Sequence, residues 1–320
     1  MRVLSGIKPS GKLHIGNYFG MIQPALEMQE EHEPFLFIAD YHALTTTQDP
    51  EAMREHTLDL ALGYLACGLD PEKTVFYRRS DVPEVTELTW LLSCITPMGL
   101  LERCHAYKDS LARGASASHG LFSYPVLMAA DILAVQSDIV PVGRDQKQHL
   151  EVARDMAIKF NNQFGEVFKI PEPQIRDEVA VVPGVDGQKM SKTYDNTIEL
   201  FGPIKPIRKT IMRIVTDSKT VEESKDPDAS TIFQLYCLFA TDAQRDDLAE
   251  RYRAGGLGYG QAKKELFELF EAHFGPYRER REELAKDIGS VKRILEEGAE
   301  KARVVVNETL ARARQAVGLD

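Results

Sequence analysis

Two short segments of this sequence contain residue types suited to binding a nucleotide. The first covers residues 5–17 and contains three glycines and a proline around His14. This composition predicts a short strand, a turn and a helix that begins near Gly16. Such a turn directs backbone N–H groups toward one point, where they can bind phosphate, and His14 offers two ring nitrogens as further donors. An ordinary turn between a strand and a helix would explain the same residues.

The second segment, residues 187–193, has the sequence Gly-Gln-Lys-Met-Ser-Lys-Thr. Lys189 and Lys192 on a glycine-hinged loop can move onto a triphosphate and neutralise the charge that grows on a leaving pyrophosphate. Positioning and charge stabilisation would supply most of the catalysis of such a reaction, and no protein nucleophile would be needed. On its own, a loop rich in lysine is usually a solvated surface.

Polar residues follow two predicted strands at the edge where a doubly wound sheet binds its ligand. His42 comes shortly after one apolar run of strand length, and Gly143, Asp145 and Gln146 follow another. Asp145 can accept hydrogen bonds from ribose hydroxyls, and Gln146 can both donate to and accept from a zwitterionic amino acid. A structural histidine and an aspartate that caps a helix are the alternative explanations.

The segment 124–133 combines an apolar helix pattern with one carboxylate. A helix that starts near Pro125 would place Tyr124, Met128 and Asp131 on neighbouring turns of one face. Burying a carboxylate is costly unless the group has a partner. An indole N–H would be such a partner, with Met128 as a polarizable wall for the ring. A solvent-exposed aspartate or a salt bridge between packed helices would explain Asp131 equally well.

Taken together, these segments resemble the class I aminoacyl-tRNA synthetases, which have a His-Ile-Gly-x tetrapeptide early and a Lys-Met-Ser-Lys-Ser/Thr loop late. The patterns Tyr-Pro-x-x-Met-Ala-Ala-Asp at 124–131 and Gly-x-Asp-Gln-x-Gln-His at 143–149 resemble the tryptophanyl branch. The likeness extends over nearly the whole length. The tyrosyl enzymes, which are the nearest relatives of that branch, typically have glutamine where Met128 stands. The resemblance therefore implies tryptophan as the amino acid.

The resemblance also implies a role for each residue that matches the family's motifs. Those expected to act in catalysis are Lys8, His14, Lys189 and Lys192. Those expected to bind ATP are Lys8, Ser10, Gly16, Asn17, Gly143, Asp145, Val182, Lys189, Met190, Ser191 and Lys192. Those expected to bind tryptophan are Leu4, Gly6, His42, Tyr124, Met128, Asp131, Val140, Val142 and Gln146, with Asp131 holding the indole nitrogen.

The implied reaction has two steps. Tryptophan attacks the α-phosphate of ATP and releases pyrophosphate, and the adenylate then passes its aminoacyl group to tRNA(Trp). Mg²⁺ is expected on the phosphates of ATP, because the sequence contains no dedicated carboxylate cage and no structural metal is expected. Members of the family are homodimers. Rival hypotheses are a tyrosyl enzyme and a catalytically silent paralogue that binds nucleotide or RNA.

Two positions depart from the family's pattern. Lys8 stands where a glutamine is common, so a full charge rather than an amide is expected beside the α-phosphate. Ser110 stands where a further lysine is common in the mobile loop. The pyrophosphate contacts are therefore expected to depend more heavily on Lys189 and Lys192.

The order of elements predicts an α/β fold with a Rossmann-like, doubly wound parallel sheet and a C-terminal all-helical domain. The expected catalytic domain covers residues 1–194. It includes an insertion at about 100–120 whose small, polar residues suggest a mobile loop at an active site. Residues 195–290 are expected to form a helical tRNA anticodon-binding domain, and residues 291–320 a helix that packs back on the rest.

The most concentrated basic face of the chain lies in the predicted helical domain. A helix opened by Pro206 would place Arg208, Lys209 and Arg213 on the side opposite its isoleucines. A tRNA phosphate backbone is the natural partner of such a face. A solvated helix surface is the alternative.

The composition, 43% hydrophobic and 28% charged, is that of a soluble globular protein. The net charge of -10 argues against a nonspecific nucleic-acid coat protein, although local basic patches remain possible. No apolar run is long enough to span a membrane and the N-terminus has no signal pattern, so a cytoplasmic protein without a membrane partner is expected. The four cysteines are scattered, which favours buried thiols over a disulfide framework or a metal site.

Overall fold

The computed structural model describes residues 1–112, 117–142, 147–175 and 182–319. At its centre is a parallel five-stranded sheet with the order β3-β2-β1-β4-β5. The strands are β1 (Arg2–Ile7), β2 (Glu33–Ile38), β3 (Val75–Arg78), β4 (Ile139–Val142) and β5 (Glu172–Ile175). From β1 the chain adds strands first in one direction and then in the other. This is the doubly wound arrangement, and the predicted fold class is confirmed.

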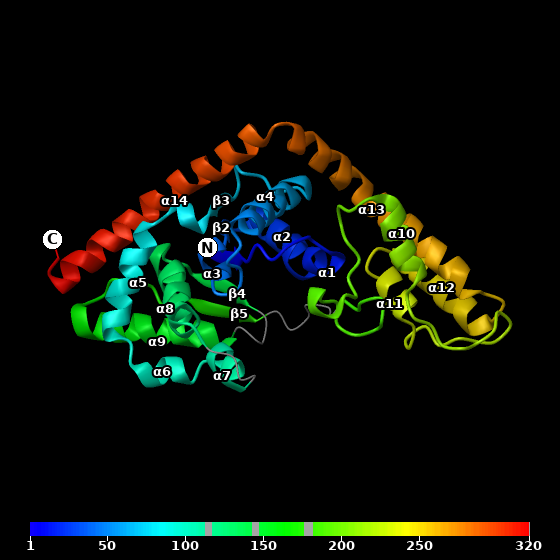
Figure 1. The fold of residues 1–320 in the computed structure, drawn as a ribbon, viewed down its shortest axis with the longest axis horizontal. Helices are drawn as coiled ribbons and strands as arrows, with labels where there is room; N and C mark the ends of the chain where they lie inside the picture. The colour runs from blue at the N-terminus through cyan, green and yellow to red at the C-terminus, as the bar shows by residue number, and fades with distance from the viewer. Residues whose placement is uncertain (113–116, 143–146, 176–181, 320) are drawn as a thin grey trace.

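Helices cover both faces of this sheet, and a further helical region extends from one end of the molecule (Figure 1). Those up to β5 are α1 (Ile15–Asn17), the π-helical turn η1 (Tyr18–Ile22), α2 (Gln23–Glu31), α3 (Asp40–Ala43), α4 (Pro50–Ala66), the 3-10 turn η2 (Arg79–Asp81), α5 (Glu84–Ile95), α6 (Met98–Glu102), α7 (His105–Ala112), α8 (His119–Ala134) and α9 (Lys147–Phe164). Those after it are the 3-10 turn η4 (Lys192–Tyr194), α10 (Ile204–Met212), α11 (Thr231–Tyr236), α12 (Asp242–Ala254), α13 (Tyr259–Lys286) and α14 (Ile288–Val317). Within the described ranges, none of the helices combines the length and apolarity needed to cross a membrane.

The core consists of two apolar clusters on opposite faces of the sheet. Successive strand residues alternate between them: Leu36 and Phe76 belong to the first cluster, and Phe35 and Tyr77 to the second. Helices α2, α4 and α13 contribute to the first cluster, and α5, α8 and α9 to the second. In β2, Pro34–Ile38 are buried on both faces of the sheet, and the strand reads in the sequence as a continuous apolar run.

Prolines mark the helix boundaries less well than the sequence suggests. Helix α4 begins at a proline, Pro50, and the Asp49 side chain accepts hydrogen bonds from its first turn. The helix predicted to start near Pro125 begins earlier, at His119, where Ser118 caps it and Pro125 lies inside. Helix α13 likewise continues through Pro276. A proline removes a single backbone donor, and the surrounding turns remain bonded.

The insertion at about 100–120 contains more helix than expected. Helices α6 and α7 occupy most of its first part, and Ser110 lies in α7. Residues 113–116, which the sequence assigns to the mobile loop, lie outside the described residues.

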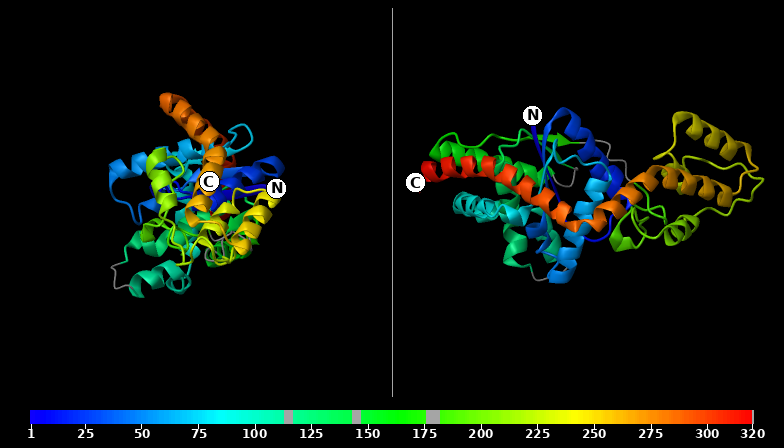
Figure 2. Two further views of the ribbon diagram at one scale, coloured as in Figure 1. Left: turned by 90° about the vertical axis from the view of Figure 1, so that its right-hand side faces the viewer. Right: turned by 90° about the horizontal axis from the view of Figure 1, so that it is seen from above.

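Helix α14 covers one edge of the sheet. Val291 belongs to the first cluster and Ala302 to the second, so the helix crosses the edge strand β3. Figures 1 and 2 show α13 and α14 as two long helices that meet at an angle and extend along the molecule. At the crossing, an added Cβ on Gly298 would lie 1.9 Å from the carbonyl oxygen of Phe76. No side chain fits there.

Replacing Gly298 with alanine should therefore lower the free energy of unfolding by at least the ~1–3 kcal/mol typical of overpacking. The clashing atoms are backbone atoms of β3, which cannot rotate away. Urea unfolding measures the effect. The matched control is Gly260→Ala in α13, where an added Cβ meets nothing within 4 Å and helix propensity favours alanine. Equal unfolding midpoints for both variants would contradict the packing of α14 on β3.

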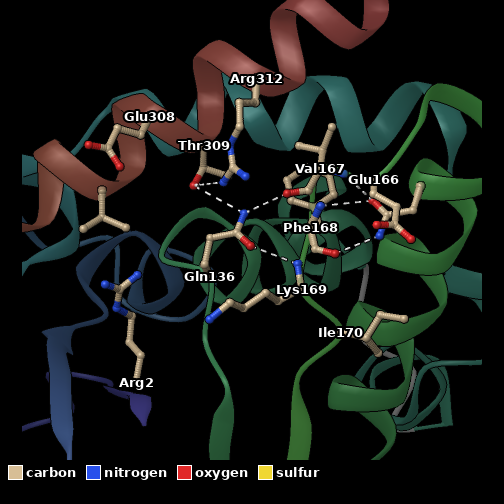
Figure 3. A pocket seen from close by; sticks show the side chains of 12 residues that line it. Arg2, Gln136, Glu166, Val167, Phe168, Lys169, Ile170, Glu308, Thr309 and Arg312 are labelled. Atoms are coloured by element: carbon tan, nitrogen blue, oxygen red, sulfur yellow. Dashed lines mark hydrogen bonds between the residues drawn. The ribbon is translucent and has the colours of Figure 1, made fainter.

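Gln136 provides a second attachment for α14, in a groove shown in Figure 3. This buried residue has a left-handed backbone, with φ of 54°. Its side-chain nitrogen donates to the Val167 carbonyl at 3.1 Å and to Thr309 Oγ1 at 3.4 Å, and its side-chain oxygen accepts from the Lys169 N–H at 2.9 Å. The amide thus joins α14 to the connection between α9 and β5. The groove also contains Arg2, at the amino end of β1, and so lies away from the carboxyl edge of the sheet.

Candidate active site

The two segments predicted to bind a nucleotide lie together in the structure. Lys192 Nζ donates to the carbonyl oxygen of Ser10 at 2.9 Å. Beside this contact, residues 198–200 pair with residues 13–15 through backbone hydrogen bonds of 2.9 and 3.0 Å. This pairing brings the lysine loop to the turn that follows β1, although the two segments are far apart in the sequence.

His14 is the residue before α1 and is 7% exposed. Its backbone N–H donates to Asn17 Oδ1 at 3.1 Å, whereas its ring nitrogen Nδ1 has no hydrogen-bond partner. Burial, together with the charge of Lys192, lowers the pKa of His14 to about 4. The ring is therefore neutral near pH 7 and donates from one nitrogen only, which corrects the expectation of two ring donors.

The lysine loop turns an apolar side chain toward the opening helix. Met190 is buried, and its N–H donates to the Val182 carbonyl at 2.9 Å. An added Cβ on Gly16 would lie 3.5 Å from Met190 Cβ and 3.0 Å from His14 Nδ1. Glycine at this position therefore lets the loop and the imidazole approach each other. Lys189, by contrast, is exposed.

Lys8 lies between the predicted nucleotide-binding and amino-acid-binding residues. It follows β1 directly, and its Nζ is 5.9 Å from the centre of the Tyr124 ring. Desolvation by the surrounding protein lowers the pKa of Lys8. The charge of Lys8 also acts on His42, whose pKa is lowered to about 3 by burial and then by Arg79 and Lys8. His42 is therefore a neutral side chain.

Asp131 is 3% exposed on α8 and has one bound and one unused oxygen. Oδ1 accepts a hydrogen bond from Arg79 Nε. Oδ2 has no hydrogen-bond partner and lies 3.5 Å from His42 Nε2. Burial raises the pKa of Asp131 to about 6, and Arg79 opposes this rise. The salt bridge left open by the sequence exists, and the carboxylate nevertheless keeps a free acceptor.

Three of the other predicted tryptophan-binding residues lie in or against the second core cluster: Leu4 and Val140 are buried in it, and Met128 packs against it. The Phe37 ring lies against Gly6, where an added Cβ would be 2.3 Å from Phe37 Cζ.

Tyr124 connects α8 to α9. Its hydroxyl is hydrogen-bonded to His149 Nε2 at 2.5 Å, and the centre of its ring lies 6.5 Å from the centre of the His42 ring. Val142 ends β4. Gly143, Asp145 and Gln146, which the sequence assigns to ATP and tryptophan, lie outside the described residues.

The family model for class I tRNA synthetases (W and Y) matches residues 1–275. The chain belongs to this family. The tryptophan–tRNA ligase of Rhodopirellula baltica is 57% identical over 100% of both chains. A crystal structure of the tryptophanyl-tRNA synthetase from Campylobacter jejuni, complexed with ADP and tryptophan, is 51% identical over 100% of both chains, with a TM-score of 0.95. The enzyme from Mycoplasma pneumoniae is 30% identical, with a TM-score of 0.81, over 100% of this chain and 98% of that one.

Sequence reasoning missed two residues of this synthetase that hold Asp131 in place. Arg79 and Ser80 follow β3 at the carboxyl edge of the sheet, just as His42 follows β2. Asp40 binds the backbone N–H of Ser80 at 3.0 Å and its hydroxyl at 2.5 Å, which ties the turn carrying Arg79 to β2. The same rule that singled out His42 could have found Arg79.

A third missed residue holds the synthetase's lysine loop. Asn196 is 1% exposed. Its oxygen accepts from the Ser191 N–H at 2.8 Å, and its amide nitrogen donates to the Lys189 carbonyl at 3.1 Å and to Asp186 Oδ1 at 2.8 Å. The turn-forming pair Asp195-Asn196 directly after the lysine motif was the available signal, and Asp195 has a φ of 51°.

Proposed function

We propose that this protein activates L-tryptophan with ATP and then transfers the tryptophanyl group to tRNA(Trp). The relatives described above, at 51 and 57% identity over the whole chain, support the proposal, as do the ADP and tryptophan bound to the Campylobacter jejuni enzyme. The observation that carries it is the buried carboxylate of Asp131, which has an unused oxygen at the sheet edge where His14 and Lys192 also lie. A ring N–H would satisfy that oxygen.

In the first step, a carboxylate oxygen of tryptophan attacks the α-phosphorus of ATP and the bond to the pyrophosphate group breaks. Lys192, Lys189 and Lys8 offset the negative charge of the reacting phosphates, and the neutral ring of His14 donates one N–H to a phosphate oxygen. The remaining residues proposed to contact ATP are Ser10, Gly16, Asn17, Val182, Met190 and Ser191. No protein nucleophile takes part.

Mg²⁺ accompanies ATP in this proposal. Among the described residues, no group of three or more His, Cys, Asp or Glu side chains is arranged to hold a metal ion. The phosphate oxygens of ATP are therefore the proposed ligands, since Mg²⁺ commonly keeps several waters and binds through phosphates.

In the second step, a hydroxyl of the terminal ribose of tRNA attacks the carbonyl carbon of the adenylate, and AMP leaves. Residues 1–194 would carry out this chemistry, residues 195–290 would bind the anticodon region, and residues 291–320 would support the sheet. Arg208, Lys209 and Arg213 are exposed at α10, as a phosphate-binding face requires, and the Arg208 guanidinium lies 5.5 Å from the ring centre of Phe267. The proposed binding partners of the protein are L-tryptophan, ATP and tRNA(Trp).

ATP–pyrophosphate exchange with each of the twenty amino acids tests the proposal. Exchange that depends on tryptophan alone is expected. Exchange with tyrosine would identify the tyrosyl alternative, and no exchange with any amino acid would identify a silent paralogue. The relatives described above are tryptophanyl enzymes and favour neither alternative.

The pH dependence of tryptophan activation should follow the ionisation of the Asp131 carboxyl group. Its pKa of about 6 predicts that kcat/KM for tryptophan falls as the pH drops below 6, because the protonated carboxyl loses the charge that strengthens its bond to the ring N–H. His14 and His42, with pKa values of about 4 and 3, stay neutral over this range. Exchange assays between pH 5 and pH 8 measure the profile, and the same acid limb in Asp131→Asn would assign it to another group.

The stability contribution of Asp131 has the opposite sign. Its folded-state pKa of about 6 lies above the ordinary value of 3.8, so the folded protein binds the proton more tightly. From this group, stability therefore rises as the pH falls from 6 toward 4. Loss of activity in that window would accordingly not reflect unfolding driven by Asp131.

A homodimer in the cytoplasm completes the proposal. Trp90 on α5 and Met98 on α6 are 68% and 63% exposed, and large apolar side chains on the surface are suited to an interface. Sedimentation equilibrium distinguishes the dimer from a monomer of 35.9 kDa.

A further inference from the structure

Arg79 is the largest side chain that is fully buried among the described residues, at 1% exposure. A buried guanidinium is costly unless its donors are used. Nε donates to Asp131 Oδ1, and Nη1 donates to the Val82 carbonyl at 2.7 Å. The guanidinium carbon lies 5.2 Å from the centre of the Tyr41 ring. The geometry of this side chain is therefore fixed on three sides.

The backbone that carries Arg79 is also fixed. The turn η2 is bound through Ser80 to both carboxylate oxygens of Asp40, at 3.0 and 2.5 Å. Asp40 begins α3, two residues before His42. Arg79 thus contacts Asp131 from the turn after β3, and His42 lies beside Asp131 from the helix after β2. These two segments are joined by the bonds between Asp40 and Ser80, and Asp131 itself belongs to α8.

Two buried polar atoms of this pair are left free. Asp131 Oδ1 accepts from Arg79 Nε, whereas Asp131 Oδ2 and Arg79 Nη2 have no hydrogen-bond partner. With Arg79 in place, the carboxylate cannot rotate to exchange its two oxygens without breaking the buried pair. A ligand therefore meets a single acceptor in a fixed direction.

We propose that Arg79 is a positioning residue for the amino-acid substrate: by binding one oxygen of Asp131, it keeps the carboxylate ionised and fixes the other oxygen as the acceptor for a ring N–H. This inference rests on the proposed function, and it assigns part of the preference for an indole N–H to a residue that need not touch the substrate. Without a cation, a buried carboxyl group takes up a proton and presents a hydroxyl, which can donate as well as accept.

The surroundings of Asp131 leave Arg79 as its cationic partner. The titratable or charged groups that face it are Arg79 from η2, His42 from α3 and Tyr77 from β3. His42 is neutral, because its pKa is about 3, and the pKa of Tyr77 is raised by burial. Lys8 acts on His42 rather than directly on Asp131. Arginine stays charged even when buried, which lysine does not.

The test compares Arg79→Met, Arg79→Lys and the matched control Arg78→Met. Arg78 is the preceding residue and pairs with Asp81 at 2.7 Å, away from Asp131. Exchange assays give kcat/KM for tryptophan from pH 5 to pH 9, and also for a tryptophan analogue in which sulfur replaces the indole N–H. In Arg79→Met, the acid limb of the tryptophan profile should move up by about one to three pH units, because an adjacent arginine lowers a carboxyl pKa by that much.

The preference for tryptophan over the sulfur analogue should fall at least tenfold in Arg79→Met at pH 7 and recover as the pH is raised. Arg79→Lys should show a smaller shift of the acid limb, and Arg78→Met should match the wild type. A purely structural role for Arg79 would lower kcat/KM equally at every pH and for both substrates. That result would overturn the inference.

The double variant Arg79→Met/Asp131→Asn and the single variant Asp131→Asn keep the inference testable if Arg79→Met fails to fold. The double variant removes the unpaired charge and should therefore fold. Its pH profile should lack the acid limb, and it should not prefer tryptophan over the sulfur analogue. Retained preference in the double variant would overturn the inference. If wild-type protein itself does not distinguish tryptophan from the sulfur analogue, the proposed contact between Asp131 and the indole fails. If Asp131→Asn abolishes the preference but Arg79→Met keeps it with an unmoved acid limb, only the role of Arg79 fails.

Discussion

Replacing Asp131 with asparagine should lower kcat/KM for tryptophan by about 10²- to 10⁴-fold. A buried site that hydrogen-bonds a polar group of its substrate discriminates strongly, because an unmatched polar group inside the protein has no water to bind instead. Asparagine keeps the size of the side chain but loses the negative charge, and its amide cannot satisfy Arg79 and the ring N–H as the carboxylate does. Tryptophan-dependent pyrophosphate exchange measures the loss, and KM for ATP should change little.

The matched control is Asp138→Asn. Asp138 is also an aspartate beside the sheet, but it lies at the amino end of β4, where it binds the Arg2 N–H at 2.7 Å and Lys169 Nζ at 2.9 Å. Its replacement should leave kcat/KM for tryptophan within a factor of about two, since surface ion pairs contribute little. If both variants lost activity to the same degree, Asp131 would have no special part in binding tryptophan.

Replacing Lys192 with alanine should slow tryptophan-dependent pyrophosphate exchange by about 10²- to 10³-fold, the usual cost of removing one charge-stabilising donor. Its Nζ donates to the Ser10 carbonyl in the turn after β1, whereas Asp131 is held by Arg79. Equilibrium binding of tryptophan, measured by calorimetry without ATP, should therefore remain nearly unchanged.

Lys12→Ala is the control for this lysine. Lys12 lies on the same turn, is 72% exposed and pairs with Glu199 at 3.2 Å. It should reduce the exchange rate by no more than a few fold, which separates a specific role of Lys192 from a general loss of positive charge. Parallel losses of tryptophan binding and exchange rate in Lys192→Ala would count against the role proposed for that residue.

Strand β2 could be predicted from the sequence, because a strand buried on both faces reads as a continuous apolar run, whereas β5 has the sequence Glu-Pro-Gln-Ile and carries no such pattern. The sequence also predicted that His14 and Lys192 would meet, since both belong to motifs of one family. The start of α8 was predicted less accurately than the fold class. The helix begins at His119 and runs through Pro125, because tertiary packing outweighs the loss of one backbone hydrogen bond.

The contacts that hold the site together were harder to predict. Arg79 reaches Asp131 across 52 positions of sequence, and its partner depends on how α8 packs against the sheet. The neutral state of His14 depends on burial, which no local pattern reveals. Asn196 uses both ends of its amide inside a loop, and a short polar residue in a loop usually indicates only a turn.

The position of α14 has a consequence for how the protein is made. The ribosome completes all five strands before it adds the helix that lies over β3. Until then, the outer strand presents unpaired backbone groups to any neighbouring nascent chain, which is the usual starting point for aggregation. Messages truncated before Gly298 should therefore yield insoluble product even though every residue proposed to contact the substrates has been translated.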